Sequence, residues 1–282
     1  MSNLKDIRNH LRSIENIKKI TDAMERVAAA RLKRAQAKAE QSRPYFKKMK
    51  EILEKLSASD IQNPLFTPHA EKKKTALIVI SADKGLSGSY NSNILNTADK
   101  FAKKFEPQQL DLLLFGKKAI EHFKGKPWPT IFQRIDWAGK ISLHEIQLFT
   151  HDVIGRFLNS TYDEVWLIYT HYINVMNRDV ILEKFLNIER PKKKDDEIFL
   201  SYVFEPDPTT IINEILPRYC ITRIQTALNE AYASELASRI VAMQTASNNS
   251  ENLIEELTLK RNKIRQEGIT KEIIEITSAS KL

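Results

Sequence analysis

Glycine is scarce in this sequence and unevenly placed. Only seven glycines occur in 282 residues, and six of them lie between Gly85 and Gly155. Neither glycine nor proline occurs from residue 1 to 43 or from residue 218 to 267. Because these two residue types are the strongest interrupters of a helix, their absence predicts two very long terminal helices with one compact domain between them.

Other absences exclude whole classes of protein. A single cysteine, Cys220, excludes an internal disulfide and a cysteine-rich zinc site. No run approaches the roughly 18 apolar residues that a transmembrane helix needs. The six histidines lack the spacing of a metal-binding motif. No Ser/His/Asp set or pair of carboxylates stands out, so we expect no catalytic residues and no metal site.

The apolar residues of both terminal segments recur at helical spacing. In the first segment they step by three and four, which is typical of a coiled-coil seam: Leu4, Ile7, Leu11, Ile14, Ile17, Ile20, Met24 and Val27. The extra step of three from residue 17 to 20 predicts a local interruption of the heptad. The second stripe comprises Ile224, Leu228, Tyr232, Leu236, Ile240, Met243, Leu253, Leu257 and Ile264. We expect a loosely wound antiparallel pair, the alternative being core helices of an ordinary bundle.

The middle of the chain alternates between strand-like and helix-like segments. Apolar or β-prone runs occur at 75–81, 110–115, 164–170, 180–188 and 199–204. Helical patterns lie between them at 91–105 and 142–159, with a short helix expected after the second strand. This alternation predicts a three-layer α/β domain with a largely parallel sheet. The expected organisation is an N-terminal helix at 1–57, a linker at 58–74, the α/β domain at 75–205 and a C-terminal helix at 206–282.

A loop with two glycines follows the first predicted strand, where an α/β fold can hold a phosphate group. However, Gly85 and Gly88 do not form the G-x-G-x-x-G pattern, and Lys84 precedes them rather than following. We therefore expect no nucleotide and no other cofactor at this loop. The two glycines are better explained by a positive φ or by close approach of another segment.

The positive charge of the chain is concentrated at its start. Residues 1–56 hold fifteen Lys and Arg against seven Asp and Glu, a balance of +8 that equals the net charge of the whole chain. Arg31, Lys33, Arg34 and Lys38 form a basic face on the predicted helix. Such a face predicts an acidic partner (nucleic acid, a membrane surface or an acidic protein loop) or is simply solvated. No aromatic residue precedes Pro44, which weakens the nucleic-acid interpretation.

Several blocks of this sequence resemble the gamma subunit of rotary ATP synthases. They are 7–32, 81–88, 202–208, 235–244, 257–266 and 269–273, and they occur in the same order as in that family. The departures are Lys84, Ser87 and Ser89, where the family usually has Arg, Cys and Gly, and Ser278, where it usually has Gly. The resemblance implies a long antiparallel coiled coil of the terminal helices with an inserted Rossmann-like three-layer α/β domain.

By this resemblance the chain is a central rotor shaft, a non-catalytic subunit of a proton-transporting ATP synthase. The coiled coil would enter a ring of alpha and beta subunits. The α/β domain would lie at the foot, near the epsilon subunit and the membrane c-ring. The chain would lie at the cytoplasmic face of the bacterial membrane, attached only through the complex.

The resemblance also assigns individual residues. It places Met24, Arg239, Arg265 and Gln266 at contacts with a beta subunit. It places Tyr202, Glu205 and Asp207 at the foot, facing the c-ring and the epsilon subunit. Capping of the following helix is the alternative for the two acidic residues, since the helix dipole favours negative charge there.

Two other functions stay open on the residues alone. One is a basic coiled-coil protein that binds nucleic acid, and the other is an α/β enzyme with helical extensions. Co-purification distinguishes them from a rotor, because the rotor should be isolated together with alpha and beta subunits. A nucleic-acid-binding protein should instead retain nucleic acid with a steep salt dependence.

Overall fold

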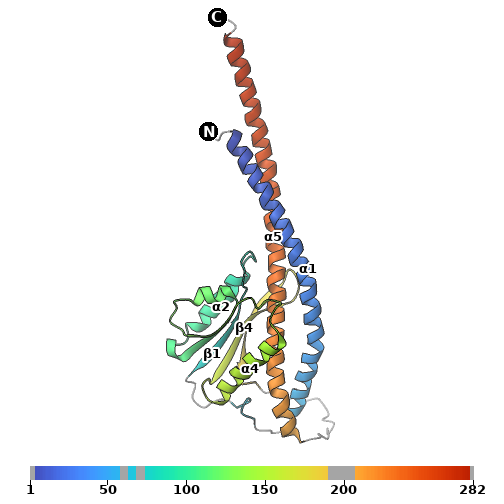
Figure 1. Cartoon of the computed structure of the whole chain (residues 1–282), viewed down its shortest axis with the longest axis vertical. Helices are drawn as coiled ribbons and strands as arrows, with labels where there is room; N and C mark the ends of the chain where they lie inside the picture. The colour runs from blue at the N-terminus through green and yellow to red at the C-terminus, as the bar shows by residue number, and fades with distance from the viewer. Residues whose placement is uncertain (1–3, 58–62, 68–73, 190–206, 280–282) are drawn as a thin grey trace.

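Two very long helices and a small sheet make up the computed structural model, which describes residues 4–57, 63–67, 74–189 and 207–279. Helix α1 spans Leu4–Ser57 and helix α5 spans Pro208–Ala279. At a rise of about 1.5 Å per residue they are about 80 Å and about 110 Å long. They run antiparallel and side by side, and α5 extends past the N-terminal end of α1 (Figure 1). The prediction of two long terminal helices is confirmed.

The buried face of α1 follows an uninterrupted heptad. Its residues are seven positions apart and all are buried: Ile7, Ile14, Thr21, Ala28 and Ala35. Three residues of the predicted seam are exposed instead: Ile17 (43%), Ile20 (58%) and Val27 (51%). The predicted interruption of the heptad is therefore wrong. The buried positions Thr21, Ala28 and Ala35 are small, although larger apolar residues such as Ile20 and Val27 are adjacent in sequence. The small side chains let α5 approach α1 closely.

The corresponding face of α5 also becomes smaller and more polar toward the C-terminus. Leu228, Leu236 and Met243 of the predicted stripe are buried, but Leu253 is 43% exposed, so its place in the stripe is wrong. The buried positions after Met243 are Ser247 and Ser250. Polar contacts join the helices here: the Ser247 hydroxyl donates to the Asp22 carboxylate, and Lys18 Nζ lies 2.9 Å from Glu251 Oε1.

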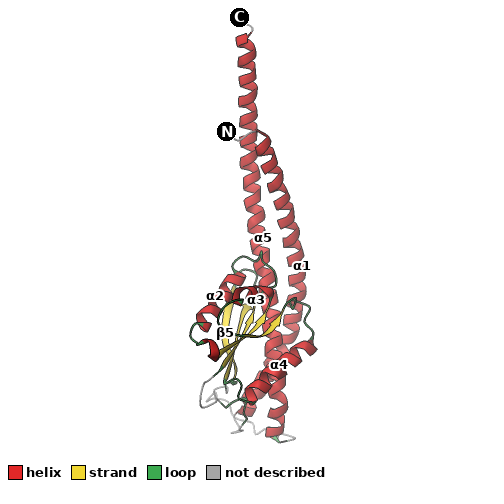
Figure 2. Cartoon of the chain, turned by 60° about the vertical axis from the view of Figure 1, so that its left-hand side comes forward, coloured by secondary structure: helices red, strands yellow, loops and turns green. Residues whose placement is uncertain are grey.

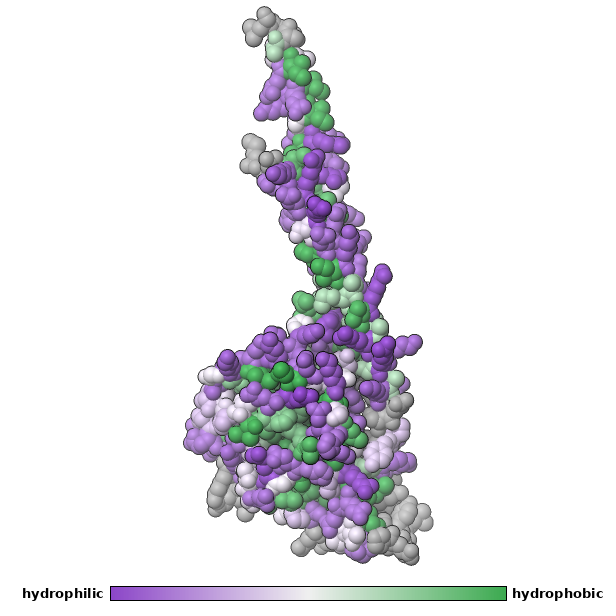
Figure 3. All heavy atoms as spheres, viewed as in Figure 1, coloured by the Kyte–Doolittle hydropathy of each residue, from purple (hydrophilic) through white to green (hydrophobic). Residues whose placement is uncertain are grey.

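The last part of α5 lies beyond the end of α1 and has no helix beside it. Every residue from 265 to 279 is exposed. Figure 3 shows hydrophobic residues among hydrophilic ones on this tip. Four isoleucines there are 49–68% exposed: Ile269, Ile273, Ile274 and Ile276.

The middle of the chain forms a five-stranded sheet in the order β3-β2-β1-β4-β5. The strands are β1 (Thr75–Ile80), β2 (Leu110–Phe115), β3 (Thr130–Arg134), β4 (Glu164–Tyr172) and β5 (Arg178–Leu186). All neighbouring strands are parallel except β4 and β5. Every residue of β1 and β2 is buried, as expected for parallel strands that are covered on both faces.

Helices cover both faces of this sheet (Figure 2). Helices α2 (Tyr90–Ala102) and α3 (Lys117–Phe123) pack on one face. Helix α4 (Leu143–Leu158) and the first part of α5 pack on the other. The three-layer α/β fold is confirmed, and one of its layers is built partly from the long helix α5.

The sequence did not predict β3, and one other predicted strand is not tested. Strand β3 is at the edge of the sheet, and its residues alternate between exposed and half-buried. It therefore lacks the continuous apolar run that marked β1 and β2. The β-prone segment 199–204 lies outside the described residues.

Gly116 is required where β2 meets β1. Its φ is +94°, and a Cβ atom there would lie 2.2 Å from the carbonyl oxygen of Ser81. The Ser81 hydroxyl bridges the same corner, because it donates to Phe115 O (3.1 Å) and accepts from the Ala119 amide (2.8 Å). A side chain at Gly116 would therefore push apart two buried strand ends.

We expect Gly116→Ala to lower the free energy of unfolding by more than about 2 kcal/mol, because it combines positive φ with a backbone clash. The matched control is Gly155→Ala in α4, where no atom lies within 4 Å of the new Cβ. That change should raise the stability by about 0.5–1 kcal/mol. Urea unfolding followed by circular dichroism measures both, and similar stabilities of the two variants would contradict this account of Gly116.

Candidate functional site

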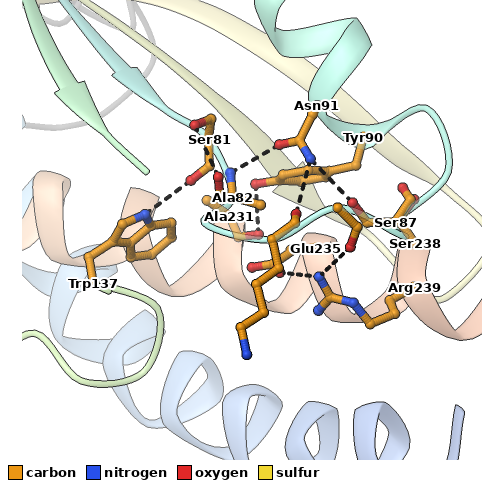
Figure 4. A network of polar contacts seen from close by, with 12 residues as sticks. Ser81, Ala82, Ser87, Tyr90, Asn91, Trp137, Ala231, Glu235, Ser238 and Arg239 are labelled. Atoms are coloured by element: carbon orange, nitrogen blue, oxygen red, sulfur yellow. Dashed lines mark hydrogen bonds and ion pairs between the residues drawn. The ribbon is translucent and has the colours of Figure 1, made fainter. Parts of the chain in front are cut away.

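The order of the chain in the sheet reverses at β1, which lies between β2 and β4. The loop at 81–89 leaves the carboxyl end of β1 at this point. In open α/β sheets this is the place where a ligand normally binds. Here helix α5 passes across it, so the loop contacts a segment of its own chain about 150 positions away (Figure 4).

Three hydrogen bonds join this region to α5. The Ser238 hydroxyl donates to Ser87 O at 2.7 Å. Arg239 Nη2 donates to Gly85 O at 3.2 Å, and the Tyr90 hydroxyl donates to Ala231 O at 3.0 Å. We call these contacts, between residues 85–90 and residues 231–239, the junction. Each bond uses a backbone carbonyl, so the junction holds the main chain of the loop or of α5 in place.

A buried ion pair lies in the junction. Arg239 Nη2 is 2.6 Å from Glu235 Oε1, and the two side chains are 11% and 5% exposed. Burial raises the pKa of the Glu235 carboxyl, and the Arg239 charge opposes this shift. Removing one partner of such a pair leaves a buried charge and costs about 3–5 kcal/mol. Both residues belong to α5, so the pair holds the Arg239 side chain in the position from which it donates to Gly85 O of the loop.

The loop is also ordered from within. Asn91 Oδ1 accepts from the Ala82 amide at 3.1 Å, and its Nδ2 donates to Lys84 O at 3.4 Å. The indole of Trp137 donates to Ser81 O at 3.0 Å from the opposite side (Figure 4). The junction thus rests on a loop whose ends are both held.

Only one of the two loop glycines behaves as predicted. Gly88 has a φ of +54°, and a Cβ there would lie 3.7 Å from both Ser238 Oγ and Ala242 Cβ. For Gly85 the prediction is wrong, because its φ is not positive and a Cβ would meet open space. The residue with positive φ beside it is Leu86, at +59°.

Strands β4 and β5 are bound to α5 by further polar contacts. Ser234 donates to Thr170 O at 3.1 Å, and His171 Nδ1 lies 2.6 Å from Glu230 Oε2. Arg223, 10% exposed in its side chain, lies 2.9 Å from Glu183 Oε1. It also donates to the carbonyl oxygens of Phe185 and Lys184. Sequence reasoning missed these contacts, and the only available signal was charge inside an otherwise apolar helical stripe.

The structure separates the predicted site residues. Met24 is half-buried on α1, and Arg265 and Gln266 are exposed where α5 extends past α1. Arg239 belongs to the junction. Tyr202 and Glu205 lie outside the described residues.

Asp207 caps the first turn of α5. One carboxylate oxygen accepts from the amides of Thr209 and Thr210, both at 3.1 Å, and the other accepts from the Thr210 hydroxyl at 2.7 Å. These bonds lower the pKa of the Asp207 carboxyl. The capping interpretation therefore holds for this residue.

In the part of the chain that the structure describes, no three or more His, Cys, Asp or Glu side chains gather as metal ligands would. None of the described helices has an apolar stretch sufficient to cross a membrane.

Comparison with known proteins agrees with this architecture. A family model described as ATP synthase matches residues 3–281. The ATP synthase gamma chain of Protochlamydia amoebophila is 46% identical over 282 residues, covering 99% of both chains. The gamma chain of Desulforudis audaxviator is 34% identical and also covers 99% of both chains.

Solved structures show the same fold. One is a chain from the central stalk and c-ring of the Tetrahymena thermophila mitochondrial ATP synthase, with 25% identity and a TM-score of 0.60. It covers 81% of this chain and 99% of its own. A chain of the Euglena gracilis mitochondrial ATP synthase is 16% identical with a TM-score of 0.68, covering 98% of this chain and 93% of its own, which is a likeness of fold. The chain therefore belongs to the ATP synthase gamma chain family.

Proposed function

We propose that this chain is the central rotor shaft of a rotary ATP synthase. It couples proton flow through a membrane c-ring to ATP synthesis in a ring of alpha and beta subunits. The chain itself carries out no chemistry in this role. It transmits torque from the foot to the catalytic ring.

The observation that carries this proposal is the continuity of α5. Its first part lies in the core of the α/β domain, through residues such as Ile212, Leu216 and Ala231. Its middle pairs with α1, and residues 265–279 extend alone. One helix therefore joins the domain rigidly to a distant tip, as a shaft requires.

The proposed contacts with the beta subunits lie on the helical part. Met24 and the pair Arg265 and Gln266 are accessible to a surrounding ring. Exposed polar contacts, such as those expected of Arg265 and Gln266, are worth about 0–1 kcal/mol each, which suits a contact that must break in every turn. Arg239 contributes chiefly through the junction, since 11% of its side chain is exposed.

The proposed foot is at the opposite end. Asp207 directly precedes α5 there, and Tyr202 and Glu205 come earlier in the sequence. We assign this corner to the c-ring and the epsilon subunit, with the complex at the cytoplasmic face of a bacterial membrane. The chain is peripheral and reaches the membrane only through its partners.

Affinity purification of the tagged chain from cells that make the other subunits tests this function. We expect alpha, beta, epsilon and c subunits to elute with it, together with ATPase activity. Recovery of nucleic acid in their place, released steeply as salt is raised, would favour the basic coiled-coil alternative.

Changing Arg265 and Gln266 together to Ala tests the proposed beta-subunit contact. Both side chains are exposed and neither is needed for the fold, so helicity and melting temperature of the isolated chain should not change. ATP hydrolysis by the reconstituted ring at saturating substrate should fall, because planar donors and an amide are lost from the contact. Lys271→Ala with Glu272→Ala, on the same exposed tip, is the control, and equal activities of the two double variants would refute the assignment.

A cross-link tests whether the junction stays closed during rotation. The separation of 3.7 Å between a Cβ at Gly88 and Ala242 Cβ suits a disulfide. We therefore expect Gly88→Cys with Ala242→Cys to form one on oxidation, while the native Cys220 is buried. Because loop and helix belong to one rotating body, the oxidised and reduced proteins should have equal ATP hydrolysis and equal proton pumping.

The two single-cysteine variants serve as controls for strain at Gly88. A loss of turnover on oxidation of the double variant, restored by reductant, would mean that the junction opens during the cycle. In that case the domain and α5 would not rotate as one body.

A further inference from the structure

A pocket of about 710 Å³ is lined by residues 225–232 of α5, next to the segment of that helix that forms the junction. It is bounded by α1, the loop at 137–141, the start of α4, and α5. Small-molecule sites typically have volumes of about 300–1,000 Å³. The pocket is therefore large enough for an organic ligand, and the proposed rotor function does not use it.

The charged part of the lining is entirely positive. Arg31, Arg34 and Lys38 of α1 are spaced by three and four residues, so they share one face of the helix, and Lys140 lies on the opposite wall. No Asp or Glu of the described residues lines the pocket. Among the described residues, none of the three α1 cations has an ion pair, and Lys140 has only an exposed contact with Asp136 at 4.0 Å.

These cations are part of the basic face that the sequence assigned to an acidic partner. Lys33, the remaining member of that face, is exposed and does not line the pocket. All four side chains are exposed, and the structure divides the face into three cations that line the pocket and one that does not. Like charges held together without carboxylates favour binding of an anion.

The wall that carries Lys140 is already formed. The amides of Lys140 and Ile141 both donate to Trp137 O at 3.0 Å, and the Trp137 indole is anchored on Ser81 O. Gly139 has a φ of +72°, and a Cβ there would lie 3.0 Å from the Tyr232 ring. The loop therefore packs closely against α5, and little ordering remains to be done when a ligand binds.

The rest of the lining is apolar with a few amides. Leu228 and Ile146 are buried beneath the cavity. Gln225 and Asn229 stand four residues apart on α5, so both amides lie on the same face of that helix. Amide groups can both donate and accept, which suits the polar edge of a flat heterocycle.

We propose that this pocket binds a nucleotide, with its phosphates at Arg31, Arg34, Lys38 and Lys140 and its base over the apolar floor beside Gln225 and Asn229. Planar arginines favour phosphate oxygens because they donate in pairs. A pocket bounded by α1, α4, α5 and the loop at 137–141 fits a small molecule better than an acidic helix of a partner protein. The site is separate from the glycine loop, whose carbonyls are engaged by α5.

Calorimetric titration of ATP, without divalent cations, into the purified full chain tests the proposal without any partner subunit. We expect one ATP per chain, bound more tightly than tripolyphosphate, which supplies the charge but no base. Arg34→Ser should weaken ATP binding by about tenfold or more, because a charge-assisted contact is lost. Lys33→Ser removes an equal charge next to it and should leave the affinity almost unchanged.

A second variant tests the base-binding half. Asn229→Ala should weaken ATP binding while leaving tripolyphosphate binding unchanged, and the melting temperature of each variant checks its fold. Equal effects of Arg34→Ser and Lys33→Ser would overturn the proposal in favour of general electrostatic attraction. Equal affinity for ATP and tripolyphosphate would refute the proposed base-binding site. If neither compound binds, the proposal fails, and binding of an acidic helical peptide would then assign the pocket to a protein partner.

Discussion

The burial of α5 between the sheet and α1 is the constraint on which the rest of the structure depends. From residue 227 to 238 almost every position of α5 is buried, including Ala227, Ala231, Ala233 and Ala237. A helix this enclosed must have small side chains wherever another element comes close, because packed interiors leave no room for extra atoms. The alanines therefore set how near the sheet and α1 can lie. The same segment belongs to two cores at once, one with the sheet and one with α1.

Because this segment is enclosed, its polar side chains must find hydrogen-bond partners within the protein. Glu230, Ser234, Glu235 and Ser238 are all less than 9% exposed, and an unpaired buried polar group costs about 1–3 kcal/mol. Most of their partners are at strand ends and in the loop after β1, which is where an α/β sheet leaves backbone carbonyls free. Satisfying these groups therefore fixes the rotation of α5 relative to the sheet. The place that other α/β folds use for a ligand has become the attachment point of the long helix.

The sequence predicted the elements better than the contacts between them. The lack of glycine revealed both long helices, and apolar runs located β1 to within one residue and β2 at its observed bounds. Strand β3 was missed because an edge strand needs only half its residues to be apolar. The seam of α1 was misread at Ile17 and Ile20 because the register of a coiled coil depends on its partner helix, which no local pattern contains. The junction could not be predicted for the same reason, since Ser87 and Ser238 meet across 151 positions. The recognised family blocks assigned Arg239 to a beta-subunit contact and did not reveal its bonds to Glu235 and to Gly85 O.

Along α5 the surroundings change from buried and bonded to fully exposed. Near the sheet, the buried hydroxyls of Ser234 and Ser238 donate to the carbonyl oxygens of Thr170 and Ser87, and leaving such a buried group unpaired costs about 1–3 kcal/mol. Farther along, the contact with α1 uses a half-exposed pair, Lys18 with Glu251, and every residue from 265 to 279 is exposed. Because an exposed pair is worth about 1 kcal/mol or less, interactions of the tip with its surroundings can form and break readily, while those of the domain end cannot. A rotor needs this order of strengths: its own parts must hold together more firmly than any of them holds to the ring in which it turns. In α5 this order of strengths follows from the decrease in burial along the helix, from the sheet to the exposed tip.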